Sequence, residues 1–318
     1  MKRVFALILA LIMILSLAAC DKESNESGSL TFTTGSNTGT YYAFGTVMGD
    51  MVSDSTDTKV TVISSNGSQS NIEAILSGDA NIAFVQSDVM AYGYNGTRFF
   101  AEAGAVTNFS VVAAMYMEQV QIVTLDPSIK SVSDLAGKRV SIGAVGSGVY
   151  YNAMDILDVY GLTEDDITPS FYDFSKTIDA LQDGSIDAGF LVAGAPTNAV
   201  TSLTSTKDAY LVSLDDEHIR ALIASSPYYA KNTIGSEVYG TLEDVTTVGI
   251  SAVVVASDSA SDDDVYNFIS AVFNNLDALV HDKTKEVSLD FAASVTDVPY
   301  HPGAARYFRE KGLTVPTK

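Results

Sequence analysis

The chain has almost no cysteine or histidine. Cys20 is the single cysteine among 318 residues, and His218, His281 and His301 are the three histidines. One cysteine cannot form an internal disulfide, and these four residues lack the spacing of a metal-binding cluster. We therefore expect no thiol chemistry and no zinc site, and we expect neither another metal nor a cofactor.

Basic residues are scarce as well. The 18 lysines and arginines are outnumbered by 39 aspartates and glutamates, which gives a formal net charge of −21 at pH 7. A protein that binds nucleic acid needs a basic surface, because binding must release the counterions of the phosphates. The charge balance therefore disfavours nucleic acid as a partner.

The apolar run at the N-terminus is too short for a confident membrane span. It covers residues 4–15, follows Lys2 and Arg3, and precedes the small residues of positions 16–19. This order of charged, apolar and small segments is typical of a secretory signal peptide. The sequence therefore predicts a signal peptide over residues 1–19 and a location outside the cytoplasm.

The segment Leu17-Ala18-Ala19-Cys20 resembles the lipobox of bacterial lipoproteins, in which the cysteine is lipidated and becomes the first residue. We expect lipidation at Cys20 and a membrane-anchored polar linker over residues 20–29, where nothing apolar is available to pack. The alternatives are a retained membrane anchor or a buried free cysteine.

From Leu30 onward, β-branched runs alternate with helical periodicities, which is the pattern of an α/β protein with largely parallel sheets. Ser70 with Glu73 three positions later predicts a capping box, and Gly78 predicts the end of that helix. The first unit is expected to contain strands over 30–34, 59–64 and 82–85, with helices around 44–52 and 70–77.

A second unit repeats the first about a hundred residues later. The sequence GTYY at 39–42 matches GVYY at 148–151, and IEAI at 72–75 matches IDAL at 178–181. Two matches in the same order predict two lobes built on one plan.

Two apolar segments, 111–125 and 248–256, are expected to cross between the lobes, and a long helix is expected to run from Val265 to Val280. The run Asp262-Asp263-Asp264 is interpreted as a solvated helix start, in preference to a metal cluster. The predicted organisation is lobe 1 over 30–116 and 248–318, lobe 2 over 117–247, and a ligand cleft between them.

Small residues and helix N-termini are predicted to meet at this cleft from both lobes. Free N–H groups at a helix N-terminus bind carboxylates without help from lysine or arginine. Turn glycines, helix caps and packing tyrosines are the alternative roles for the same residues. The candidate ligand-binding residues are Gly35, Ser36, Thr38, Gly39, Tyr41, Ser68, Asn71, Gln86, Asp88, Ser147, Gly148, Tyr150 and Gly194.

Enzyme motifs are weak. The segment GAVGSG at 143–148 lacks the spacing of a dinucleotide fingerprint or a P-loop, and Ser147 lacks the flanking glycines of a nucleophile elbow. His301, between Pro299 and Pro302, is interpreted as a structural turn residue. We therefore expect no enzymatic activity, with a lipid-anchored hydrolase that uses a carboxylate pair as the alternative.

Several short motifs occur together and in order: TGS at 34–36, GxYY at 39–42, NGSxxN at 66–71, VQSD at 85–88, NGT at 95–97, DLxGKxV at 134–140, GSG at 146–148 and VPYHPGA at 298–304. Together they resemble the TAXI-type extracytoplasmic solute receptors of tripartite ATP-independent periplasmic (TRAP) transporters. Val149 and Asn66 depart from that pattern, because the family often has threonine and glycine there.

The resemblance implies a two-lobed class II periplasmic-binding-protein fold and a ligand such as glutamate, glutamine or a related organic acid. The expected function is capture of a small carboxylate or amino acid by hinge closure and its delivery to TRAP permease subunits in the membrane. The main alternative is a binding protein of an ABC importer or of a sensor.

Overall fold

The computed structural model describes residues 28–318. The predicted signal peptide over 1–19, the predicted lipidation at Cys20 and the linker up to residue 27 lie outside the described residues. Within residues 28–318, no helix is both long enough and apolar enough to cross a membrane.

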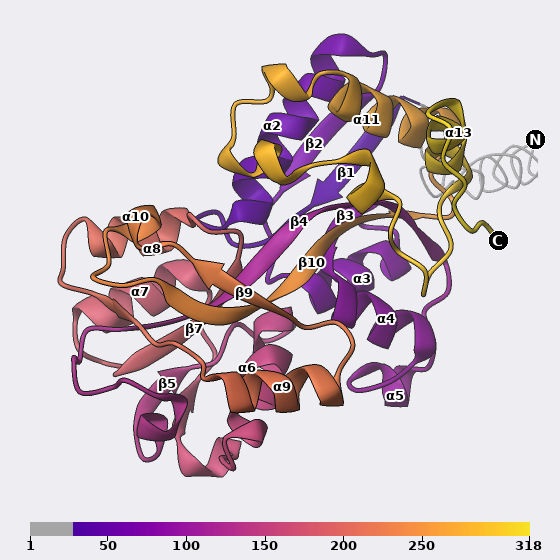
Figure 1. The fold of residues 1–318 in the computed structure, drawn as a ribbon. Helices are drawn as coiled ribbons and strands as arrows, with labels where there is room; N and C mark the ends of the chain where they lie inside the picture. The colour runs from indigo at the N-terminus through magenta and orange to yellow at the C-terminus, as the bar shows by residue number, and fades with distance from the viewer. Residues whose placement is uncertain (1–27) are drawn as a thin grey trace, which may run out of the picture.

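Ten strands of the described chain form one twisted mixed sheet, in the order β2-β1-β3-β10-β4-β7-β5-β6, with β8 paired to β4 and β9 paired to β10 (Figure 1). The strands are β1 (Ser29–Thr33), β2 (Lys59–Ile63), β3 (Ile82–Gln86), β4 (Phe109–Thr124), β5 (Arg139–Ser141), β6 (Thr168–Ser170), β7 (Ala188–Ala193), β8 (Tyr210–Leu211), β9 (Ala230–Ile234) and β10 (Val245–Ser257).

The predicted repeat is present in the strand arrangement. In one half of the sheet β1 pairs in parallel with β2 and β3, and in the other half β5 pairs in parallel with β6 and β7. We name the part built around β1–β3 lobe 1 and the part built around β5–β7 lobe 2. Each half thus has three parallel strands, joined to the other half by antiparallel ones.

The two long strands, β4 and β10, belong to both lobes. β4 pairs with β10 from Phe109 to Gln119 and then with β7 from Gln119 to Thr124. The segments predicted to cross between the lobes are therefore strands β4 and β10. The predicted boundaries at residues 116/117 and 247/248 fall inside these strands, so the division of the chain into lobes at those positions stays a prediction.

Helices cover both faces of each half of the sheet (Figure 1). The α-helices are α2 (Thr40–Ser55), α3 (Ser68–Ser77), α4 (Ser87–Asn95), α5 (Phe100–Ala103), α6 (Gly148–Val159), α7 (Phe174–Gln182), α8 (Asn198–Thr204), α9 (Asp216–Ser225), α10 (Ser236–Tyr239), α11 (Asp262–Asn274), α12 (Leu289–Ala292) and α13 (Pro302–Glu310). Short 3-10 helices are η1 (Val132–Leu135), η2 (Glu164–Asp166), η3 (Leu276–Ala278) and η4 (Asp282–Glu286).

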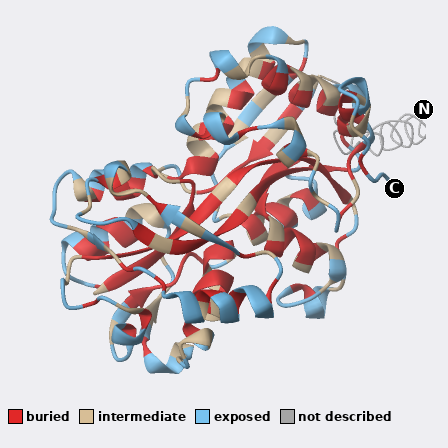
Figure 2. Ribbon diagram, in the orientation of Figure 1, coloured by how far each residue is buried: buried red, intermediate tan, exposed pale blue. Residues whose placement is uncertain are grey.

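The central strands of the sheet are buried along almost their whole length (Figure 2). In lobe 2, Val120 and Ile122 of β4 pack into one apolar cluster, whereas Val123 packs into a second cluster on the opposite face. In lobe 1, Phe32 packs against Phe84, with ring centroids 5.2 Å apart. Sheets covered on both faces have buried strands with few polar residues, as this sequence has.

Two helix predictions are wrong in detail. Helix α3 begins at Ser68 with Gly67 as its N-cap, so Ser70 lies inside the helix and forms no capping box. Gly67 takes φ 115°, a conformation that favours glycine and sets the start of the helix two residues early. Helix α11 ends at Asn274, and Val280 beyond it is 89% exposed.

The three aspartates at the start of α11 are not equivalent. Asp263 is exposed and pairs with Arg306 at 2.8 Å. Asp264 is buried, and its carboxylate accepts hydrogen bonds from the Gly28 N–H (3.1 and 3.0 Å) and the Thr58 hydroxyl (2.6 Å). The third aspartate therefore joins the first strand, the start of β2 and α11, in addition to favouring the helix N-terminus.

We expect Asp264→Ala to lower the free energy of unfolding by about 1–3 kcal/mol, because it leaves buried donors without an acceptor. Asp263→Ala is the matched control, since it removes the same charge from the same helix turn at an exposed ion pair, for about 0.5 kcal/mol. Urea unfolding of both variants measures the difference. Equal losses would show that Asp264 acts only through the helix dipole.

Candidate functional site

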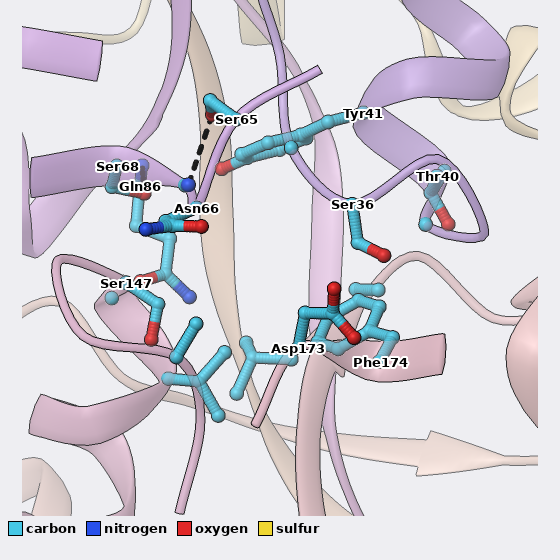
Figure 3. Close-up of a pocket in the computed structure, with 18 of the residues that line it drawn as sticks. Ser36, Thr40, Tyr41, Ser65, Asn66, Ser68, Gln86, Ser147, Asp173 and Phe174 are labelled. Carbon is cyan, nitrogen blue, oxygen red and sulfur yellow. Dashed lines mark hydrogen bonds between the residues drawn. The ribbon is translucent and has the colours of Figure 1, made fainter. Parts of the chain in front are cut away.

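A cavity lies where the two lobes face each other, beside strands β4 and β7 (Figure 3). Its empty space is about 510 Å³, including the part that opens to solvent. The lining residues are Gly35, Ser36, Gly39, Thr40, Tyr41, Ser65, Asn66, Gly67, Ser68, Gln86, Glu118, Ala144, Ser147, Gly148, Val149, Asp173, Phe174, Val192 and Ala193.

Four helices begin at the cavity: α2 and α3 from lobe 1, and α6 and α7 from lobe 2. The N-cap residues of α2, α3 and α6 are Gly39, Gly67 and Ser147, and none of them forms a side-chain cap hydrogen bond. Asp173 caps α7 by accepting a hydrogen bond from the Lys176 N–H (2.8 Å). The uncapped ends direct backbone N–H groups and a partial positive charge at the cavity.

The charged side chains of the lining are both acidic. Glu118 and Asp173 are the carboxylates, and no lysine, arginine or histidine of the described chain lines the cavity. Any positive potential in the cavity therefore comes from the backbone. The predicted capture of an anionic group without basic side chains is compatible with this lining.

Several buried polar atoms of the lining have no hydrogen-bond partner within the described residues. They are the Tyr41 hydroxyl, Gln86 Oε1, Glu118 Oε1 and the Ser147 hydroxyl. Figure 3 shows Tyr41, Gln86 and Ser147 on the walls of the same cavity. Buried polar atoms almost always have partners, so a cluster of unpaired ones inside a cavity indicates where a ligand binds.

Eight of the thirteen candidate ligand-binding residues line the cavity. They are Gly35, Ser36, Gly39, Tyr41, Ser68, Gln86, Ser147 and Gly148. Gly148 lies so close to Gln86 Oε1 that a Cβ atom there would overlap it. Only glycine allows the α6 N-terminus and the Gln86 side chain to meet at this point.

The other five candidates lie outside the lining. The side-chain amide of Asn71 donates to the carbonyls of Thr34 (2.6 Å) and Phe84 (2.7 Å), so it joins the loop after β1 to β3. Thr38 and Gly194 take part in contacts between the lobes, and Asp88 lies in a buried polar network beside the cavity.

Tyr150 turns away from the cavity, and its hydroxyl donates to Glu164 Oε2 at 2.8 Å. The reason is a one-residue difference in where the two helices begin. Tyr41 is the second residue after the N-cap of α2, whereas Tyr150 is the third residue after the N-cap of α6. One residue rotates a side chain by about 100° around a helix, so Val149 takes the lining position in lobe 2.

The most important lining residue missing from the candidates is Glu118. Its one signal in the sequence is that it lies within the apolar segment 111–125, where an unpaired carboxylate is costly to bury. Asp173 and Phe174 were also missed, because a helix N-cap and a half-buried aromatic residue have no distinctive sequence pattern. The other missed lining residues are Thr40, Ser65, Asn66, Gly67, Ala144, Val149, Val192 and Ala193.

The lobes touch on both sides of the cavity. On one side, the Thr40 hydroxyl donates to the Gly194 carbonyl (2.7 Å), and the Thr38 and Ser175 hydroxyls are 3.2 Å apart. On the other side, the Ser70 N–H donates to the Gly146 carbonyl (3.0 Å). These contacts enclose the cavity between the lobes.

A buried polar network also joins the lobes, next to Gln86. The Gln86 side-chain amide donates to Asn152 Oδ1 (3.0 Å), and the Asn152 amide donates to Asp88 Oδ2 (3.0 Å) and to the Tyr229 hydroxyl (3.0 Å). Gln86 and Asp88 come from lobe 1, whereas Asn152 and Tyr229 come from lobe 2. This network fixes the orientation of the Gln86 side-chain amide. Gln86 Oε1 takes no part in the network.

Burial changes the acidity of two carboxyl groups near the cavity. Burial raises the pKa of Asp88 to about 7, partly offset by hydrogen bonds from the Val89 N–H and Asn152. Burial raises the pKa of Glu118 to about 8, partly offset by Tyr41. Both groups are therefore held partly or mainly protonated at neutral pH in this arrangement.

The three histidines lie away from the cavity. His218 stacks on Tyr160 with ring centroids 3.6 Å apart, and His281 caps η4. His301 is buried and caps α13 by accepting from the Gly303 N–H (3.2 Å), which is a structural role as predicted. In the described part of the chain, no group of three or more His, Cys, Asp or Glu residues is placed to hold a metal ion.

Comparison with known families gives a match over most of the described chain. The sequence pattern of the NMT1-like family matches residues 32–312. The chain belongs to the NMT1-like family. The TAXI resemblance is a finer assignment than this match, and it stays a prediction for this NMT1-like protein.

Three solved structures with similar folds illustrate the likeness. The alkanesulfonate-binding protein SsuA from Xanthomonas axonopodis pv. citri, bound to MOPS, is 14% identical with a TM-score of 0.50, over 90% of this chain and 91% of that chain. An ancestral arginine-binding protein bound to arginine is 15% identical with a TM-score of 0.50, over 81% and 97%.

The ligand-binding component of an ABC-type import system from Staphylococcus aureus, with zinc bound, is 11% identical with a TM-score of 0.50, over 92% of this chain and 94% of that chain. At these identities the likeness shows the fold alone. It confirms the predicted α/β periplasmic-binding-protein-like fold of the NMT1-like protein.

Asp88 provides a test of the buried network. Its folded-state pKa lies above the ordinary 3.8, so the folded protein keeps a proton that the unfolded chain releases. The stability from this group is full below about pH 4 and is lost as the pH rises through about 7, for a change on the order of 2–4 kcal/mol. Asp88→Asn keeps the shape and cannot titrate.

We therefore expect the unfolding free energy of Asp88→Asn, relative to the native protein, to rise between pH 5 and pH 8. Urea unfolding at both pH values measures it. The exposed Asp158→Asn change in α6 is the control and should give the same difference at both pH values. A difference for Asp88→Asn that stays constant or falls would contradict the buried, protonated state.

Proposed function

We propose that this NMT1-like protein is an extracytoplasmic solute-binding protein. It captures a small carboxylate or amino acid between its lobes and delivers it to a membrane transporter. The observation that supports this most directly is the cluster of unpaired polar atoms on Tyr41, Gln86, Glu118 and Ser147, which line one cavity between two lobes. A ligand that bonds to these atoms replaces the water they lose when the lobes close.

The two lobes contribute different atoms to the ligand. Tyr41, Gln86 and the N-termini of α2 and α3 belong to lobe 1, whereas Ser147 and the N-termini of α6 and α7 belong to lobe 2. A ligand that contacts both sets binds the closed arrangement better than an open one. That difference in affinity is what drives closure.

We assign the carboxylate of the ligand to the uncapped helix N-termini. The N-caps Gly39, Gly67 and Ser147 leave the first N–H groups of three helices directed at one cavity, and no basic side chain competes for the anion. Sulfonates meet the same donors, and a structural neighbour binds a sulfonate buffer. Sulfonates therefore belong in any ligand panel.

For the transporter we favour an ABC importer, the alternative to the TRAP permease that the TAXI resemblance implies. A structural neighbour is the ligand-binding component of an ABC-type import system. Lipidation at Cys20 would hold the receptor at the outer face of the membrane, near either type of transporter. A membrane anchor and a solute receptor are compatible in both cases.

A binding role also fits the lining better than the hydrolase alternative. Among the residues 28–318, no histidine or cysteine lines the cavity to act as a base or nucleophile beside Ser147. The carboxyl groups of Glu118 and Asp173 remain the possible catalytic pair of that alternative. Incubation with a bound ligand should return it unchanged by mass spectrometry, and a product would support the hydrolase.

Thermal unfolding with a panel of amino acids, dicarboxylates and sulfonates is the primary test. Saturation with a true ligand at a hundred times its Kd adds about 2.7 kcal/mol of stability and raises the midpoint. Tyr41→Phe should weaken binding about 5- to 30-fold, because it removes a hydroxyl that has no other partner.

The matched control is Tyr150→Phe, which removes the corresponding hydroxyl of the second repeat, bonded to Glu164 outside the cavity. It should leave the affinity unchanged. The proposed function fails if no compound in the panel raises the midpoint. The proposed position of the ligand in this cavity is wrong if Tyr150→Phe weakens binding as much as Tyr41→Phe does.

The transporter is identified by cross-linking the liganded protein to its native membrane, followed by mass spectrometry of the captured complex. A permease that comes with a nucleotide-binding ATPase subunit supports the ABC importer. A large permease without an ATPase subunit supports the TRAP transporter and contradicts our preference.

A further inference from the structure

Glu118 is placed where both lobes meet. It lies on β4 opposite Ile250 of β10, one residue before β4 changes its pairing partner at Gln119. Its side chain lines the cavity and is only 1% exposed.

Among the described residues, the Glu118 carboxyl group forms no ion pair, although Tyr41 and Gln86 lie near enough to lower its pKa. Oε1 has no hydrogen-bond partner within residues 28–318. Lys283 is the cation near it, but the Lys283 ammonium is held by Glu286 at 2.5 Å. Burying an ionised carboxyl group without an ion-pair partner costs free energy. A ligand that supplies the partner offsets that cost.

The unpaired atoms beside Glu118 are a carbonyl oxygen and a hydroxyl group. Gln86 Oε1 is a carbonyl oxygen and can only accept, and the hydrogen bond from Gln86 Nε2 to Asn152 Oδ1 fixes the orientation of the amide. Glu118 Oε1 is the second unpaired acceptor, and the Tyr41 hydroxyl lies near them as a group that both donates and accepts. The protonated acid has one O–H donor of its own, whereas ionised Glu118 and Gln86 Oε1 are both acceptors, with which a ligand group with several N–H donors would pair.

We propose that Glu118, with Gln86 Oε1, forms the subsite for a positively charged nitrogen group of the ligand. The receptor accordingly prefers solutes that have both a carboxylate and an ammonium or similar cationic group over carboxylates or sulfonates without nitrogen. This inference rests on the proposed function and narrows its ligand class to zwitterionic amino compounds. The carboxylate contacts the helix N-termini, and the cationic nitrogen contacts Glu118.

The electrostatics of the cavity support this assignment. Glu118 and Asp173 are its charged side chains, and the remaining positive potential comes from helix ends. Burial raises the pKa of Glu118 to about 8, and the Asp88 carboxyl raises it further, whereas Tyr41, Gln86 and Lys283 lower it. A ligand ammonium at this position stabilises the ionised form, and the acid then releases its proton to solvent.

The test is isothermal titration calorimetry with matched pairs that differ only in an amino group. Suitable pairs are L-glutamate with glutarate, L-alanine with propionate and L-phenylalanine with 3-phenylpropionate, together with an alkanesulfonate. The amino member of the pair that fits the cavity should bind about 10- to 100-fold more tightly, because a hydrogen bond to a buried charge is worth more than a neutral one.

Glu118→Gln keeps the shape and removes the charge, so the preference for the amino member should fall to less than about threefold. Glu164→Gln is the control, because Glu164 bonds to Tyr150 outside the cavity, and it should keep the full preference. The comparison of ligands on the native protein stands even if Glu118→Gln does not fold.

The outcomes separate this inference from the proposed function. Binding of glutarate, propionate or the sulfonate as tight as that of the amino compounds overturns the Glu118 subsite and leaves a solute receptor. Unchanged preference in folded Glu118→Gln overturns it as well. Absence of binding by every compound overturns the proposed function itself.

Discussion

The pairing of β4 with β10 is the interaction on which the rest of this molecule depends. These two antiparallel strands run through both lobes, and each exchanges one set of neighbours for another along its length. Both strands run without a break from one lobe to the other. The cavity therefore lies beside strands that the two lobes share. Their register shifts, after Ala252 and Val254, lie on the lobe 1 side of the changeover at Gln119. Strand bulges bend a sheet locally, so the two lobes can face each other across one sheet.

The second constraint is polar satisfaction. Contacts between the lobes enclose a space whose walls include unpaired oxygens on Tyr41, Gln86 and Glu118. Each such atom makes the enclosed arrangement less stable until it gains a partner, whereas the bonds through Asn152 and Thr40 favour it. The balance between these opposing terms decides how strongly a solute shifts the equilibrium. A receptor that closed fully without a ligand would give no signal to a transporter.

Much of the architecture was predictable, because it follows from local periodicity. The crossing segments became β4 and β10, and the repeat of GTYY and IEAI corresponds to α2, α3 and β3 matched by α6, α7 and β7. Details that depend on a single backbone conformation were not predictable. A helix that begins one residue earlier turned Tyr150 outward, and the left-handed Gly67 moved the start of α3 away from Ser70. Glu118 was missed because its importance lies in what its neighbours leave unpaired, which only the three-dimensional arrangement shows.

Both described ends of the chain belong to lobe 1, where Gly28 is bound by Asp264 and the C-terminal α13 packs on α11 (Figure 1). Lobe 2 is thus one uninterrupted stretch of sequence, entered along β4 and left along β10, which are hydrogen-bonded neighbours. Two adjacent junctions therefore suffice to exchange this whole stretch for that of a relative. Lobe 1, which contains both described ends, would stay the same, whereas the lobe 2 side of the cavity would be replaced. Recombination at these two junctions would therefore change one wall of the cavity and leave the packing around both described ends intact.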